Sequence, residues 1–204
     1  APSISSSATA SVAENQTSAI DVDATDAITY SISGTDATSF SIDSASGVVT
    51  FNTAPDYEAK TSYTFTATAT DVAGNASTQS VTITITDVDD TNPTMTITAT
   101  GVTDGSTSDA STLSLTFTSS EATTDFLAED ITITNATIGA LSGSGTTYTA
   151  TLTPTAQGAV TIDVAAGAFT DAASNNNTAA TQFNWTYDSV NPTMTITATG
   201  VTDG

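Results

Sequence analysis

The sequence predicts an all-β protein made of tandem β-sandwiches. Apolar residues recur at every second position through most of the chain, which is the period of a strand rather than that of a helix. The stretch NPTMTITATGVTDG begins at Asn92 and again, unchanged, at Asn191, 99 residues later. A period of about 100 residues is the size of one small sandwich. We therefore expect Greek-key sandwiches in an elongated array.

The repeat also predicts the domain boundaries. We expect a first domain over residues 1–91 and a second over residues 92–190, each long enough to form its own core. Residues 191–204 repeat the beginning of the second domain, so we interpret them as the truncated first strand of a further domain of that kind.

In the first domain, alternation marks three strands, and turn residues lie between them. Apolar side chains occupy every second position, with threonine or serine at most positions between them. Clusters of Gly, Asn, Asp and Ser at 43–47 and 71–75 indicate tight turns. The expected strands include residues 28–32, 63–69 and 81–85.

The second domain shows the same alternation of apolar and polar residues, in a different sequence. We expect Gly143 to Gly145 to form a hairpin tip, and Pro154 to end a strand or lie at an edge because it has no N–H to donate. Phe183, Trp185 and Tyr187 share one face of a strand and should build the core. The expected strands include residues 113–117, 131–133, 148–152, 160–164 and 183–187.

The charge of the chain limits its partners. There are 22 acidic residues and one basic residue, Lys60, which gives a formal net charge of −21. Nucleic acids and anionic membranes are excluded as direct partners because binding them relies on Lys and Arg. Self-repulsion of this size destabilises a compact state unless cations neutralise it, and calcium is the expected cofactor.

The residue inventory also argues against an enzyme. The chain lacks both Cys and His, which excludes disulfides, thiolate metal sites and a Ser-His-Asp triad. Asp56 and Glu58 are the candidate pair for a carboxylate hydrolase, but neighbours on one extended segment make a poor cleft. No apolar run approaches the roughly 20 residues that a membrane-spanning helix needs, so direct membrane insertion is not expected.

Several acidic residues have a spacing suited to calcium. Calcium takes six to eight oxygen ligands, so carboxylates must converge from separate segments. Asp56 and Glu58 are two positions apart, which would place both on one face of an extended segment. Asp87, Asp89 and Asp90 put three charges within four residues, and they would repel one another without a cation.

The first domain resembles a bacterial cadherin-like domain. The resemblance is carried by Ala13-Glu14-Asn15, Pro55-Asp56-Tyr57-Glu58, Ala69-Thr70-Asp71 and the closing stretch from Asp87 to Pro93. It implies calcium at the junction with the next domain, although Asp89 and Thr91 stand where the family usually has asparagine. The ligands implied by this resemblance are Glu14, Asp56, Glu58, Asp87, Asp89 and Asp90.

The second domain is similar to a bacterial Ig-like repeat of large surface adhesins. The matching segments are Ser120-Glu121, residues 130–135, residues 143–154 and residues 171–175. The resemblance implies that Glu121, Asp171 and Asp188 lie near domain ends. It also implies that Asp104 and Asp109, from loops, meet the linker carboxylates there.

These observations together predict a calcium-rigidified extender of a large secreted bacterial surface adhesin, located outside the cell or on its surface. Its expected partners are neighbouring repeats of the same chain, with surface glycans or proteins bound through distal domains. Two alternatives stay open. One is a carbohydrate-binding accessory module of a secreted polysaccharide-degrading protein. The other is a subunit of an extracellular filament that assembles when residues 191–204 add a strand to a neighbour.

Overall fold

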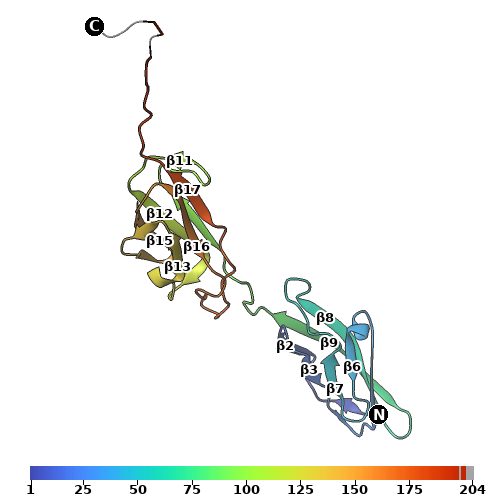
Figure 1. Ribbon diagram of the computed structural model, residues 1–204. Coiled ribbons are helices and arrows are strands. Elements are labelled where there is room, and N and C mark those ends of the chain that lie inside the picture. Colours follow the sequence, from blue (N-terminus) through green and yellow to red (C-terminus); the bar gives the residue numbers. More distant parts are fainter. Residues whose placement is uncertain (198, 201–204) are drawn as a thin grey trace. The chain divides into compact units, whose positions relative to one another are not determined.

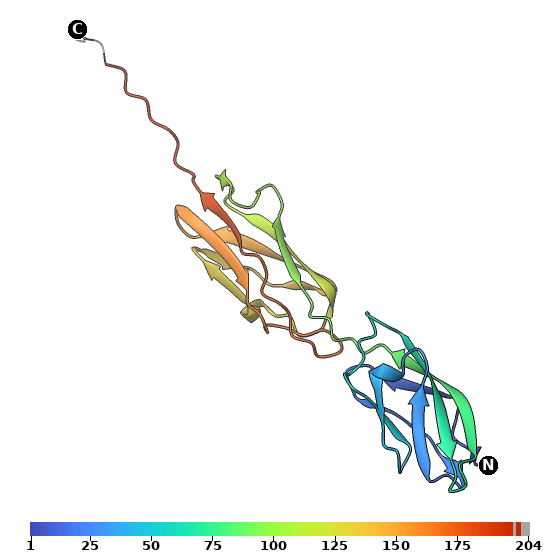
Figure 2. The same ribbon diagram turned by 90° about the vertical axis from the view of Figure 1, so that its right-hand side faces the viewer.

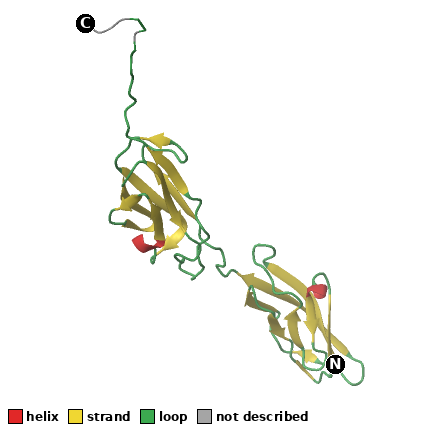
Figure 3. Cartoon of the chain, viewed as in Figure 1, coloured by secondary structure: helices red, strands yellow, loops and turns green. Residues whose placement is uncertain are grey.

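The computed structural model describes residues 1–197 and 199–200 (Figure 1). Contacts divide the chain into unit 1, Ala1–Asp89, and unit 2, Asp90–Gly204. Strands make up the regular structure of both units, and the described helices are two short 3₁₀ turns, Ala37–Ser39 (η1) and Ala128–Asp130 (η2) (Figure 3). The all-β prediction is confirmed.

Unit 1 is a sandwich of a four-stranded and a three-stranded sheet with a small additional ribbon. The four-stranded sheet has the order β2-β9-β8-β5, in which the neighbours β2 and β9 pair in parallel. The other sheet has the order β3-β7-β6, and β1 pairs with β4. The strands are β1 (Ser3–Ile4), β2 (Thr9–Ala13), β3 (Ser18–Asp21), β4 (Ala24–Thr25), β5 (Thr29–Ser33), β6 (Phe40–Ile42), β7 (Val48–Phe51), β8 (Ser62–Thr70) and β9 (Ala76–Thr86).

The core of unit 1 lies between its two larger sheets. Phe65 of β8 is buried against Phe40 of the opposite sheet, with ring centroids 5.0 Å apart. The expected alternation holds along β8 and β9, but Ile28 precedes β5 and is 55% exposed. The buried hydrophobic residues of this core are Val12, Ala19, Val22, Phe40, Val49, Phe51, Phe65, Ala67, Val81, Ile83 and Ile85.

Unit 2 is a second sandwich, made of two four-stranded sheets (Figure 2). Their orders are β10-β12-β15-β14 and β11-β17-β16-β13, and β11 pairs in parallel with β17. The strands are β10 (Met95–Ala99), β11 (Thr107–Ser108), β12 (Leu113–Thr123), β13 (Ile131–Thr134), β14 (Ala136–Ile138), β15 (Ser142–Pro154), β16 (Gly158–Val164) and β17 (Phe183–Tyr187).

Aromatic and branched side chains fill the core of unit 2. Phe183 and Trp185 are 5% and 1% exposed, and Tyr187 packs against the same cluster, so the core role predicted for these residues is confirmed. Phe126 contacts Phe169 from another loop, with centroids 5.4 Å apart. Burying such large apolar surfaces is the main stabilising term of the sandwich.

The outer faces of the two four-stranded sheets that contain β8 and β12 are covered by hydroxyl side chains. In unit 1, Thr66 lies opposite both Ser33 and Ser80, and in unit 2, Thr116 lies opposite both Thr98 and Thr149. Threonine suits such positions because it is β-branched and tolerates solvent.

Two local predictions have different outcomes. Pro154 ends β15, as expected. Gly143 to Gly145 do not form a hairpin tip, because β15 already begins at Ser142 and Gly145 pairs with Thr123 of β12. The long β15 extends through this glycine-rich stretch past an irregularity in the ladder, which sequence alternation alone does not reveal.

The predicted strand at 191–204 lies partly outside the described residues, at 198 and 201–204. Residues 191–197 contain no strand in the part that is described. Met194 and Ile196 are 87% and 86% exposed, whereas the identical residues Met95 and Ile97 are 5% and 7% exposed in β10. A strand needs a partner, and β10 has β12. The interpretation of 191–204 as the start of a further domain stays a prediction.

Candidate metal centre

Glu14 anchors an acidic cluster at the C-terminal end of unit 1. It follows the last residue of β2, and 3% of its surface is exposed. Its carboxylate oxygens accept hydrogen bonds from the backbone N–H groups of Tyr57, at 2.7 Å, and Val88, at 2.9 Å. Next to it, the N–H of Asn15 donates to the carbonyl of Pro55 at 3.0 Å. One buried carboxylate therefore connects the end of β2, the turn after Pro55 and the segment that follows β9.

Glu58 and Asp87 complete this cluster. Carboxylate oxygens of Glu14, Glu58 and Asp87 lie within 4.8 Å of one another, and Glu58 and Asp87 are exposed. A hydrogen bond from its own backbone N–H lowers the pKa of Glu58, but desolvation and the charges of Glu14, Asp87 and Asp56 outweigh it and raise the pKa above 4.5. The carboxylates repel one another, and a bound cation would relieve that repulsion.

The single basic side chain of the protein pairs with an acidic residue outside this cluster. Lys60 Nζ lies 2.5 Å from Asp36 Oδ1 and 4.5 Å from the centre of the Tyr63 ring. The hydrogen bond from Lys60 is the main cause that lowers the pKa of Asp36. Positive charge for the Glu14 cluster must therefore come from solution.

The structure corrects the geometry predicted for Asp56. Residues 57–59 form a turn instead of an extended segment, because the N–H of Lys60 donates to the Asp56 carbonyl at 3.0 Å and the N–H of Ala59 donates to Asp56 Oδ1 at 3.1 Å. The prediction that Asp56 and Glu58 share one face of an extended segment is wrong. Glu58 joins the three-carboxylate group and Asp56 caps the turn that presents it.

The donor chemistry of the cluster fits calcium. Its three side chains offer only hard oxygen atoms from separate segments, which is the ligand type that Ca²⁺ prefers. Each carboxylate oxygen has two lone pairs, so the oxygens of Glu14 that accept N–H groups keep one for a cation. Glu14, Glu58 and Asp87 are therefore the residues that would hold the ion.

In unit 2, Asp171 is the most buried acidic residue, at 8% exposure among the described residues of that unit. Its Oδ1 accepts the N–H groups of Ala173 and Asn175, at 2.8 and 2.9 Å, and its Oδ2 accepts Asn175 Nδ2 at 3.0 Å. Ser174 completes the turn with a positive φ of 74°. The turn thus satisfies its central carboxylate with its own backbone.

Glu121, on β12, brings a second carboxylate to Asp171. Oxygens of the two side chains lie within 4.8 Å of each other. Desolvation raises the pKa of Asp171, but the hydrogen bonds from Asn175 and Ala173 and the contact with Glu121 outweigh it and hold the pKa below 3.8. The structure therefore brings together two of the residues predicted for the second domain.

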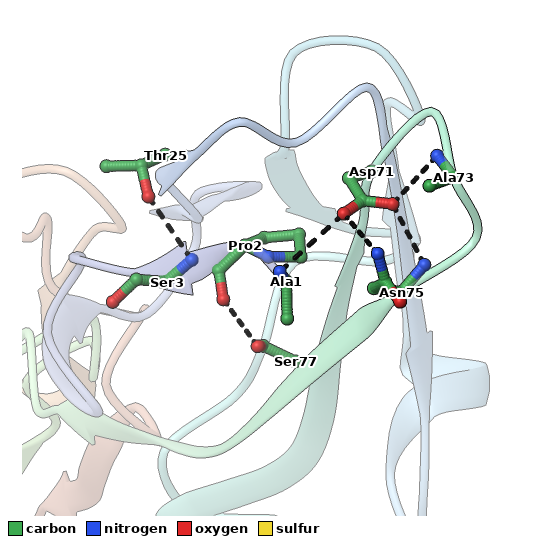
Figure 4. Close-up of polar contacts among 8 residues, drawn as sticks. All are labelled: Ala1, Pro2, Ser3, Thr25, Asp71, Ala73, Asn75 and Ser77. Atoms are coloured by element: carbon green, nitrogen blue, oxygen red, sulfur yellow. Dashed lines mark hydrogen bonds and ion pairs between the residues drawn. The ribbon is translucent and has the colours of Figure 1, made fainter.

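Asp71, which was not among the predicted ligands, forms the same turn in unit 1 (Figure 4). Its Oδ1 accepts the N–H groups of Ala73 and Asn75, both at 2.9 Å, and its Oδ2 accepts Asn75 Nδ2 at 2.8 Å. The amino group of Ala1 lies 3.7 Å from Asp71 Oδ2. The signal was present in the sequence, because DVAGN at 71–75 and DAASN at 171–175 share their first, third and last residues.

Three further predicted ligands, all in unit 2, belong to no group of converging carboxylates among the described residues. Asp104 Oδ1 accepts the backbone N–H of Asn184 at 2.7 Å and its side-chain amide at 3.0 Å, so it fixes the start of β17. Asp109 and Asp188 line one recess of unit 2, where the Asp188 N–H donates to the carbonyl of Ser108. Asp89 and Asp90 lie on the two sides of the boundary between the units, and their role as ligands stays a prediction.

Comparison with protein families divides the chain in the predicted order. Residues 3–86 match the cadherin domain, and residues 89–187 match a bacterial Ig-like domain. The predicted resemblance is therefore confirmed for both parts. Neither match is to a family of enzymes. No curated protein matches the sequence.

Solved structures of low sequence identity support the β-sandwich fold. A crystal structure of human protocadherin-24 EC1-2 is 12% identical, with a TM-score of 0.53, and the match covers 92% of this chain and 98% of that one. Protocadherin Gamma B2 extracellular cadherin domains 3-6 are 19% identical, with a TM-score of 0.51 over 93% of this chain. The chain spans about half of that structure, of which 47% is covered. In the described part of the chain, none of the helices has the length and apolar character needed to cross a bilayer.

Proposed function

We propose that this chain, a cadherin domain followed by a bacterial Ig-like domain, is a calcium-rigidified extender of a secreted bacterial surface adhesin. Domains of these two kinds support an extracellular, adhesion-type repeat module. The observation that carries the calcium proposal is the position of Glu14, which hydrogen-bonds the segment leading out of unit 1 and belongs to a cluster with Glu58 and Asp87.

The proposed mechanism is the ordering of the segment that connects the two domains. Without a cation, the charges of Glu14, Glu58 and Asp87 repel one another just where the chain leaves β9. Asp89 and Asp90 follow directly and add to this charge. A calcium ion held by the cluster would draw Asp87 toward Glu14 and restrict the linker. The domain pair would then extend a distal binding module from the cell as a stiff spacer.

Calcium titration with two readouts tests this proposal. Thermal unfolding and small-angle X-ray scattering are measured in millimolar calcium and in excess chelator. Because the ion binds only the folded cluster, we expect calcium to raise the melting temperature and to narrow the distribution of particle lengths. Asp87→Asn and Glu58→Gln should lose most of both effects, whereas Asp163→Asn, at a half-buried position of β16 in unit 2, should keep them. Identical melting and scattering in the two conditions would refute the calcium mechanism.

A second candidate function rests on the exposure of Met194 and Ile196. These residues alternate on a segment whose identical copy is buried in β10, so they have the pattern of a strand without a partner. Exposed segments of this type add to the sheet edges of other molecules. We propose strand-mediated filament assembly as the alternative to a passive spacer. Concentration-dependent assembly that disappears after deletion of residues 191–204 would favour it, and monomeric behaviour at all concentrations would exclude it.

A further inference from the structure

The parallel pairing of β2 with β9 gives unit 1 a particular response to tension. β2 is entered from the N-terminal side at Thr9, and β9 is left toward the C-terminal side at Thr86. The two strands pair over five positions, from Thr9 opposite Thr82 to Ala13 opposite Thr86. A pull on the two ends of the unit slides these strands along each other, so the hydrogen bonds of the ladder are loaded together instead of one after another.

Backbone bonds extend this ladder at both ends. The N–H of Thr82 donates to the Ala8 carbonyl at 2.9 Å, and the N–H of Glu14 donates to the Thr86 carbonyl at 3.1 Å. Beyond the last of these bonds, Glu14 Oε1 accepts the N–H of Val88. Val88 lies on the segment through which tension leaves the unit, so the bond to Glu14 is on the path of the force.

The other oxygen of Glu14 connects this point to the body of the sandwich. Glu14 Oε2 accepts the N–H of Tyr57, and Asn15 is tied to Pro55. Hydrogen bonds to a buried carboxylate are stronger than those between neutral groups. A force on Val88 must therefore break a charge-assisted bond before it separates β9 from β2.

From this arrangement we infer that Glu14 is the positioning residue of a metal-independent shear clamp formed by β2, β9 and Val88. This inference extends the proposed function from stiffness to resistance against tension, and it gives Glu14 a role that does not depend on a cation. Unit 2 serves as an internal reference because its parallel pair, β11 with β17, extends over two positions instead of five. At their end, Asp188 Oδ1 accepts the N–H of Val190, two residues away, in a local bond.

The test is single-molecule stretching of the whole chain by its two ends in excess chelator. We expect Glu14→Gln to make unit 1 unfold roughly tenfold faster at a given force, because the amide loses one of the two N–H bonds. The rate for unit 2 in the same molecules should not change. Asp21→Asn is the matched control, since Asp21 is an exposed carboxylate at the end of β3, outside the cluster and the ladder, and it should leave the rate for unit 1 unchanged.

An engineered disulfide identifies which unfolding event belongs to unit 1. The chain has no cysteine, so Ser11→Cys with Thr84→Cys, which face each other across the ladder, introduces a single possible disulfide. When the disulfide is formed, the residues between positions 11 and 84 can no longer extend. The length gained when unit 1 unfolds should then shrink to the contribution of the residues outside this loop. The event that loses length belongs to unit 1, and reduction should restore it.

A second pulling direction separates the clamp from a general loss of stability. With one handle at the N-terminus and the other at Val72→Cys, in the loop between β8 and β9, Val88 is no longer on the path of the force. Glu14→Gln should then change the unfolding rate by less than a third of its effect in end-to-end pulling. Equal effects in both directions, or no effect in end-to-end pulling, would overturn the clamp. Because all arms use chelator, their outcome is independent of whether calcium binds.

Discussion

Glu14 in unit 1 and Asp171 in unit 2 are both buried carboxylates that accept backbone N–H groups, yet their partners differ in sequence distance. Glu14 binds N–H groups that are 43 and 74 residues away. Asp171 binds N–H groups that are two and four residues away. The first arrangement exists only once the sandwich has folded, whereas the second is a local turn. The comparison teaches that similar burial can reflect either a tertiary connection or a self-contained loop.

Truncation of Glu14 should produce the largest change. Glu14→Ala leaves the N–H groups of Tyr57 and Val88 without their buried acceptor, which should cost about 2–4 kcal/mol and lower the melting temperature of unit 1 by roughly 10–20 °C. Differential scanning calorimetry of the whole chain measures this against the transition of unit 2. Glu58→Ala, in the same cluster, should not destabilise unit 1 in chelator. An equal loss in both variants would show that charge alone, rather than the two hydrogen bonds, sets the stability.

Calcium should sharpen the contrast between the units. At a calcium concentration of 100 times Kd, binding to the folded state adds about 2.7 kcal/mol, and the melting temperature of unit 1 should rise by roughly 10–20 °C. Asp87→Asn should remove most of this shift without lowering the stability in chelator. A shift that Asp87→Asn leaves intact would mean that the ion binds elsewhere.

Removal of the turn carboxylates should have smaller and similar effects in the two units. Asp171→Ala and Asp71→Ala each abolish the same set of turn hydrogen bonds. We expect each to lower the melting temperature of its own unit by less than Glu14→Ala lowers that of unit 1, because a local turn can relax into water. Serine at either position, which can still accept an N–H, should recover part of the loss. A loss after Asp171→Ala that equals the loss after Glu14→Ala would contradict the distinction between local and tertiary anchoring.

The pH dependence should be the weakest effect, and it has opposite signs at the two kinds of carboxylate. Hydrogen bonds lower the pKa values of Asp71 and Asp171 below 3.8, so their stabilisation is present above that pH and is lost as the pH falls through the lower folded value. The pKa of Glu58 is raised above 4.5, so in chelator Glu58 favours folding at low pH and loses this contribution as the pH rises through its folded pKa.

Melting curves in chelator between pH 3 and pH 7 measure these signs. The melting temperature of unit 1 should rise slightly as the pH falls toward the raised pKa of Glu58. The melting temperatures of both units should fall below about pH 3.8. Glu58→Gln should abolish the rise in the melting temperature of unit 1 but leave the fall below about pH 3.8 unchanged. If the rise persists in that variant, another group is responsible for it.

Strands were predictable from the sequence because their pattern is local. Alternation along residues 63–69 and 81–85 identified β8 and β9, and the aromatic residues at 183, 185 and 187 identified the inner face of β17. The error at Gly143 to Gly145 has a physical cause. Glycine is typical of tight turns, but it also occurs where a strand is irregular, and only the partner strand distinguishes the two.

For the candidate site, the sequence indicated which residues take part better than it indicated how they are arranged. Glu14, Glu58 and Asp87 were all expected, but the extended arrangement of Asp56 and Glu58 was wrong because a backbone bond from Lys60 to Asp56 closes a turn. The bonds of Glu14 to distant N–H groups carry no local signature. The turn at 71–75 was predicted, but the role of Asp71 as its hydrogen-bonded carboxylate was not, although DVAGN and DAASN have the same form.

The ion pair of Lys60 with Asp36 bears on how readily proteases can cut the chain. Trypsin-like proteases cut only after Lys or Arg, and this chain of 204 residues offers a single such position, between Lys60 and Thr61. In the folded protein that side chain is held by Asp36 and lies over the ring of Tyr63. The sequence of unit 2 contains neither Lys nor Arg. An acidic composition thus leaves the polypeptide almost without sites for one of the commonest classes of digestive enzyme.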